Sequence, residues 1–172
     1  TNAPLRSGKG SLYEGGIRIP MMVRWPGVTK PGSICDSPVT TCDLFPTLLE
    51  ASGLAPHDRP VDGRSFAAQL RNVNAPAAQR DLFFHYPHYY PTTTPVSMIR
   101  SGDWKLLEYY ESGAIELYNL RDDPGEQSDL AAANLRDYML KGGFVIFDDF
   151  EADQWINFEA QFRRALPDAV FR

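Results

Sequence analysis

The chain has 172 residues, of which 43% are hydrophobic, 12% aromatic and 23% charged. These fractions argue against a disordered, collagen-like or coiled-coil protein. Seventeen Lys and Arg against 22 Asp and Glu give a net charge of -5 without a basic run, so we expect no nucleic-acid partner. The apolar runs are too short to span a bilayer, and the start at Thr1 rather than Met predicts a piece of a longer protein.

The first half of the chain predicts one strand and two short helices. Residues 19–25 form an apolar run closed by Pro-Gly, which predicts a buried strand ending in a turn. Residues 43–53 predict a helix with Asp43 as its N-cap and a glycine stop. Residues 54–80 predict loops around a short helix near residues 65–70.

Four segments rich in aromatic and β-branched residues follow, at residues 81–86, 96–100, 104–110 and 114–120. Two short stretches, Ser-Gly-Asp and Glu-Ser-Gly, separate the last three segments as hairpin turns. This pattern predicts a small antiparallel sheet.

The last part of the chain predicts a helix around residues 135–139, a strand at 144–147 and a second helix. An apolar stripe at helical spacing marks that second helix: Trp155, Phe158, Phe162 and Leu166. Helix–strand–helix is typical of a partial doubly wound α/β module. Asp148 and Asp149 follow the strand and could take a hard cation, but neighbouring strand residues point opposite ways, so we favour turn and cap roles.

Residues 1–130 resemble the C-terminal portion of the sulfatase family, the arylsulfatase-like hydrolases of sulfate esters. The matching segments are, in order, LRSGKGSLYEGGIRIP from residue 5, VRWPG from 23, DLFPTLLEASG from 43, DGRS from 62, HYPHY from 85, IRSGDWKL from 99, ELYNL from 116 and DPGE from 123. Each segment is weak alone, and their order and spacing together carry the resemblance.

The resemblance implies an α/β fold of the α+β kind. Residues 1–80 would hold the last strand and helix of an alkaline-phosphatase-like sulfatase domain, and residues 81–130 a small antiparallel-sheet subdomain. Residues 131–172 would form a partial α/β module. From about residue 135 the chain resembles an uncharacterised bacterial domain with a flavodoxin-like or amidotransferase-like fold. The join near residues 132–135 would be a natural fusion, an assembly artefact or a divergent ending.

The resemblance also implies calcium and a formylglycine nucleophile, which this family makes from Cys or Ser in a C/S-x-P/A-x-R motif. Neither Cys35 nor Cys42 lies in such a motif, and the family's Asp-Asn metal pair before Gly-Lys-Gly is absent. We therefore expect no metal ligand or bound cofactor here, and no activity from the chain alone. Two buried or partly exposed thiols are the favoured state of the cysteines, and a disulfide is the alternative in an oxidising context.

Lys9 matches the family lysine whose ammonium contacts the substrate sulfate; the alternative is an exposed loop lysine. Glu14 and Arg18 are expected to brace this loop or to pair with each other. His85 and His88 could line a sugar or aryl-sulfate pocket, with His88 preferred, although packing of aromatic residues at the strand end is the favoured alternative.

These observations predict the C-terminal part of a sulfatase that hydrolyses sulfate monoesters on a carbohydrate or aryl group. A non-catalytic binding or structural module derived from that subdomain is the alternative. The parent enzyme would bind a sulfated small molecule or glycan, and the family suggests a periplasmic or secreted location. Because residues 19–25 lack a sheet of their own, we expect exposed apolar surface and self-association.

Overall fold

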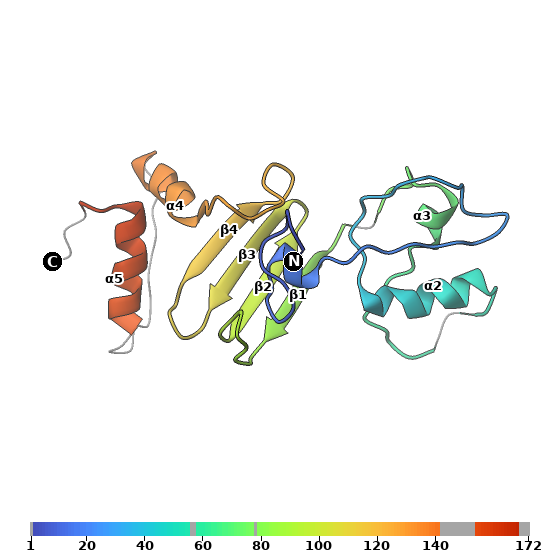
Figure 1. Ribbon diagram of the computed structural model, residues 1–172, viewed down its shortest axis with the longest axis horizontal. Helices are drawn as coiled ribbons and strands as arrows, with labels where there is room; N and C mark the ends of the chain where they lie inside the picture. Colours follow the sequence, from blue (N-terminus) through green and yellow to red (C-terminus); the bar gives the residue numbers. More distant parts are fainter. Residues whose placement is uncertain (1, 56–57, 78, 142–153, 169–172) are drawn as a thin grey trace. The chain divides into compact units, whose positions relative to one another are not determined.

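The structure is a computed structural model that describes residues 2–55, 58–77, 79–141 and 154–168 (Figure 1). The chain divides into two compact units, and each is described by itself. The sheet unit comprises Thr1–Ile19 and Arg80–Arg172, and the loop unit comprises Pro20–Gln79. This division differs from the expected domain of residues 1–80, because the first 19 residues cluster with the sheet.

A four-stranded antiparallel sheet with the order β1-β2-β3-β4 forms the centre of the sheet unit (Figure 1). Its strands are β1 (Asp81–Tyr86), β2 (Val96–Ser101), β3 (Trp104–Tyr109) and β4 (Ile115–Asn119). All four predicted segments are confirmed, with bounds that differ by one residue at most. Gly102 turns β2 into β3 with a φ of 59°, a conformation that glycine adopts without steric cost.

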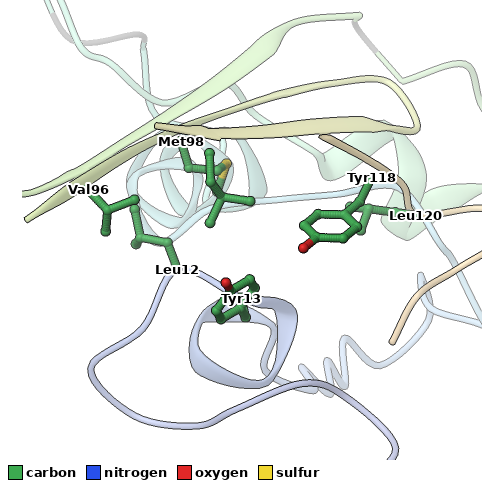
Figure 2. Close-up of a cluster of buried hydrophobic side chains, with 7 residues drawn as sticks. Leu12, Tyr13, Val96, Met98, Tyr118 and Leu120 are labelled. Atoms are coloured by element: carbon green, nitrogen blue, oxygen red, sulfur yellow. The ribbon is translucent and has the colours of Figure 1, made fainter. Parts of the chain in front are cut away.

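One face of this sheet is covered by the N-terminal segment. The buried cluster consists of Leu12, Tyr13, Val96, Met98, Leu107, Tyr118 and Leu120. Figure 2 shows the side chains of Leu12 and Tyr13 pointing toward those of the strands. Alternate strand residues point to the same face, so Val96 and Met98 reach this cluster together. The short helix α1 (Glu14–Ile17) follows directly, and the segment thereby becomes part of the sheet unit.

The loop unit contains a 3-10 turn at Thr41–Asp43 and two helices, α2 (Leu44–Ala51) and α3 (Ala67–Arg71). The two predicted helices are therefore confirmed. Asp43 stands at the predicted N-cap position of α2 but makes no side-chain capping bond to that helix, because its carboxylate accepts from the Thr40 and Arg64 N–H groups. The predicted buried strand at residues 19–25 is wrong: this segment forms no strand, and Ile19 and Met22 are 76% and 96% exposed. A buried strand needs a paired neighbour, and the sheet of the described residues pairs only β1 to β4.

Two helices end the described chain, α4 (Ala131–Leu140) and α5 (Gln154–Ala165), as predicted. They contact each other, and α4 also contacts β4. Phe162 and Leu166 of the predicted stripe are half-buried. The predicted strand at 144–147 with Asp148 and Asp149, the side chains of Trp155 and Phe158, and His57 lie outside the described residues.

Both cysteines are free thiols, as expected, but both are exposed, so the expectation that they are buried or only partly exposed is wrong. In the described part of the chain, no helix combines the length and the apolar character that a membrane crossing requires.

Candidate functional site

Lys9 lies in a turn that the loop after β1 holds in place. The hydroxyl of Thr92 donates a hydrogen bond of 3.0 Å to the Lys9 carbonyl oxygen. Gly10 has a φ of 84°, and a Cβ added there would lie 2.1 Å from the ring of Tyr90. The backbone of this turn is thus set by Gly10 and its neighbours, while Lys9 itself is exposed. The side chain is free to meet a ligand without any change in the turn.

The structure separates the two histidines that the sequence grouped together. His85 is exposed on β1, where its Nδ1 lies 2.8 Å from Ser97 Oγ and its ring meets Tyr110 edge-on at 5.9 Å. Tyr86, the next residue, packs instead against the buried cluster, because neighbouring strand residues point to opposite faces. His88 meets that Tyr86 ring edge-on at 5.4 Å.

His88 therefore belongs to the loop that contacts the Lys9 turn, two residues before Tyr90. His85 is held on the opposite side of β1 by a different set of side chains. The geometry brings the segments of Lys9 and His88 together and leaves His85 outside that group.

Three buried charged side chains lie between α1 and the sheet, and we call Glu14, Lys105 and Glu126 the ion trio. Lys105 Nζ lies 3.1 Å from Glu14 Oε1 and 2.7 Å from Glu126 Oε1. The Glu14 N–H donates to Glu126 Oε2 at 2.6 Å. Burial raises the pKa of the Glu126 carboxyl, and the neighbouring Lys105 ammonium opposes this rise.

Arg18 pairs with Glu14 at 3.8 Å, so the expected pairing of these two residues is confirmed. Lys105 and Glu126 were missed in the sequence. A signal was present, because Lys105 alternates with the buried Leu107 along β3 and so falls on the buried side of the strand.

A second buried group fixes the start of the N-terminal segment. The Arg6 guanidinium lies 3.9 Å from the centre of the Tyr13 ring and donates to Tyr118 Oη at 2.6 Å. Tyr13 donates in turn to Glu116 Oε2 at 2.7 Å and accepts from Tyr109 at 2.9 Å. Burial is the largest cause of the raised pKa of both Tyr13 and Tyr118. These phenols therefore stay neutral and act as hydrogen-bond partners.

The described residues do not fit the calcium ion or the formylglycine that the family resemblance implied. Among them, no group of three or more His, Cys, Asp or Glu side chains could hold a metal ion. Cys35 and Cys42 are exposed and lie in the loop unit, outside the group around Lys9. Among the described residues, the candidate site thus consists of the exposed Lys9 on a turn that lies against the loop of Tyr90 and Thr92.

Comparison with known families identifies the family of this chain. Residues 8–140 match the family described as N-sulphoglucosamine sulphohydrolase, C-terminal. The chain belongs to this family of sulfatase C-terminal regions. Residues 117–172 also match a domain of unknown function, DUF4159, at the part of the chain where the sequence resembled an uncharacterised domain.

Individual relatives give the extent of the likeness. A sulfatase of Formosa agariphila is 40% identical over 144 residues, which cover 77% of this chain and 26% of the relative. The steryl-sulfatase of Mus musculus is 38% identical over 91 residues, which cover 52% of this chain and 14% of the relative. The chain thus spans about a quarter or less of the length of these relatives.

Solved structures confirm the expected fold class. Ps i-CgsB superposes with a TM-score of 0.67 at 24% identity, over 94% of this chain and 37% of that protein. BT4656, solved with its substrate D-glucosamine-2-N,6-O-disulfate, superposes with a TM-score of 0.56 at 22% identity, over 84% of this chain and 28% of that protein. At these identities the likeness concerns the fold, which is the alkaline-phosphatase-like fold of sulfatases.

Proposed function

We propose that the chain forms part of an enzyme that hydrolyses sulfate monoesters on a carbohydrate or an aryl group, and that Lys9 contacts the sulfate. Family membership supports the reaction class, and the relatives include a sulfatase and a steryl-sulfatase. The observation that carries the proposal is the exposed Lys9 on a turn whose backbone is held by Tyr90 and Thr92.

An ammonium group suits this task because it is a compact positive charge, and sulfuryl oxygens gain negative charge in the transition state. A fixed turn removes the need to reorganise the backbone when the charge develops. Lys9 would therefore stabilise the transition state more than the bound substrate, which is the condition for a catalytic effect.

The loop that carries His88 and Tyr90 would contact the sugar or aryl part of the substrate, through stacking and hydrogen bonds. Its contact with the Lys9 turn supports this assignment. His85 takes at most a distant part, because Ser97 and Tyr110 hold it on the other side of β1.

The nucleophile and the calcium ligands would both come from parts of the enzyme that this chain does not contain. We therefore expect the chain alone to leave a chromogenic aryl sulfate unhydrolysed, since loss of a nucleophile costs many orders of magnitude in rate. Calcium-dependent turnover by the purified chain would contradict this expectation.

The decisive experiment is Lys9→Ala in the complete enzyme that contains this segment. We expect kcat/KM to fall by about 10²-fold, roughly 3 kcal/mol, as for the loss of one strong electrostatic contact. The melting temperature should stay unchanged because Gly10, Tyr90 and Thr92 hold the turn. Lys9→Arg should restore only part of the activity, since a planar fork replaces a point charge.

Lys30→Ala is the matched control, because Lys30 is also an exposed lysine in a loop. It should leave both kinetics and melting unchanged. Near-normal kinetics for Lys9→Ala would make Lys9 a surface lysine and would favour the alternative of a binding or structural module.

A further inference from the structure

The backbone that carries Lys9 is wound closely around α1. The Gly15 N–H donates to the Arg6 carbonyl oxygen at 2.9 Å. A Cβ on Gly15 would lie 2.3 Å from that same oxygen, and a Cβ on Gly16 would lie 2.1 Å from the Ser11 carbonyl oxygen. Residues 6–11 thus touch α1 backbone to backbone, and the position of α1 determines the position of the Lys9 turn.

The helix α1 has only four residues, which is too short to be stable without outside contacts. Its ionic contacts are made by the carboxylate of Glu14, a residue that is 1% exposed. The strongest is the ion pair with Lys105, which is itself fully buried in β3. Glu14 Oε2 has no hydrogen-bond partner among the described residues and meets Arg18 and Arg100 only at 3.8 and 4.0 Å.

We propose that the ion trio positions the Lys9 turn, with Lys105 as the positioning residue and Glu14 as its contact on α1. This inference rests on the proposed function, because it gives the trio a purpose in sulfate binding. Lys105 does not touch the substrate; it acts through α1 and the closely packed backbone of residues 6–11. The small sheet would thereby determine the position of the Lys9 ammonium, although Lys9 itself lies outside the sheet.

The charges of the trio allow a test that leaves the sheet intact. Glu14→Gln removes one of two carboxylates, and Lys105 keeps Glu126 at 2.7 Å as its partner. Lys105 and Glu126 then form a buried ion pair with no net charge. Neither ion is left without a partner, and an ion left without its partner is what makes the loss of one member of a buried pair so costly. The helix α1, in contrast, loses its ionic contact with the sheet.

Hydrogen exchange on this 172-residue chain gives the first readout. In Glu14→Gln, the amides of Ser11, Gly15 and Gly16 should exchange about tenfold faster or more, while those of β2 and β3 keep their protection, as expected for a local opening. Glu159→Gln is the matched control, because it is the same substitution in an ion pair of α5, with Arg163. Equal acceleration in loop and sheet, or no change in the loop, would overturn the proposal.

Kinetics of the complete enzyme give the second readout. Glu14→Gln should lower kcat/KM, and Lys9→Ala combined with Glu14→Gln should be no worse than Lys9→Ala alone, because both act through the same ammonium. Additive losses would contradict a positioning role. If exchange changes as expected but Lys9→Ala is harmless, the proposed function fails while the coupling of the trio to the turn stands.

Discussion

A cluster of buried apolar side chains in the sheet unit contrasts with highly exposed apolar side chains in the loop unit. In the sheet unit, Val96 and Leu107 are completely buried, whereas Met22 and Ile34 of the loop unit are 96% and 80% exposed. Four paired strands and the covering segment with Leu12 give the sheet unit a closed core of its own.

The loop unit has no strand among its described residues, and even the apolar Leu48 of α2 is 64% exposed. An open groove of about 750 Å³ runs along it, with Met21, Trp25 and Phe66 among its lining residues. A segment of about 60 residues buries only a modest part of its surface, so its own stability is marginal. The sheet unit therefore encloses an apolar core within itself, whereas the described residues of the loop unit leave large apolar side chains exposed.

The largest effect should come from Lys105→Met, which leaves two buried carboxylates without their cation. We expect a loss of about 3–5 kcal/mol in the free energy of unfolding of the sheet unit. Trp104 in β3 can report it by fluorescence during urea unfolding, once Trp25 and Trp155 are replaced by Phe. A chain that keeps only Trp25 should show an unchanged loop unit. If both reporters shift together, the two units do not unfold independently.

Exposed apolar surface in the loop unit should make the chain bind hydrophobic dyes and self-associate. Met22→Ser should weaken association by up to about 1.5–3 kcal/mol, the free energy of burying one such side chain. Analytical ultracentrifugation over a concentration series measures this. Phe83→Ser, which removes an exposed side chain of the sheet unit, should have the smaller effect. A larger effect of Phe83→Ser than of Met22→Ser would place the self-association surface on the sheet unit.

Asp43→Ala should destabilise the loop unit by about 1–3 kcal/mol, the cost of leaving buried donors unsatisfied. The buried Asp43 carboxylate accepts from the Thr40 N–H at 2.7 Å and from the Arg64 N–H at 2.8 Å. Asp43→Asn should lose less, since its amide oxygen keeps one acceptor. The unfolding transition reported by Trp25 should shift to lower urea concentration, and the transition reported by Trp104 should not change. A shift at Trp104 would contradict the separation of the units.

The smallest effect should be the pH dependence of Glu126→Gln. Burial raises the pKa of Glu126 in the folded state; Lys105 of β3 opposes this, while Glu14 of α1 adds to it. A carboxyl whose pKa is raised on folding favours the folded state below its unfolded pKa, and this stability is lost as pH rises through the folded pKa. The melting temperature of Glu126→Gln, relative to that of the unchanged chain, should therefore rise progressively from pH 4 to pH 7. A difference in melting temperature that stays constant with pH would contradict the raised pKa of Glu126.

Local patterns predicted most of the sheet unit. Aromatic and β-branched residues located all four strands, and two glycine turns separated the last three, because these signals lie within a few residues of each strand. The predicted strand at 19–25 was wrong because an apolar run shows a need for burial but does not show that a partner strand is present.

The site was predictable only in part. A motif identified Lys9, but nothing local showed that Gly10 lies under the Tyr90 ring, 80 residues away in the chain. The sequence favoured His88 over His85 but did not show that the two side chains meet different neighbours, because that depends on which way each residue of the strand end points. Lys105 was missed because a buried lysine is recognised by its partners, and Glu14 and Glu126 are distant in sequence.

The sheet unit is built from two stretches of chain that the 60 residues of the loop unit separate. Leu12 can join Leu107 only after this long loop has closed. Closure entropy grows slowly with length, so halving the intervening segment would gain only about 0.6 kcal/mol. The folding rate is more sensitive, because contacts between distant residues must form before they stabilise anything. The sheet unit should therefore fold more slowly than its small hairpins suggest.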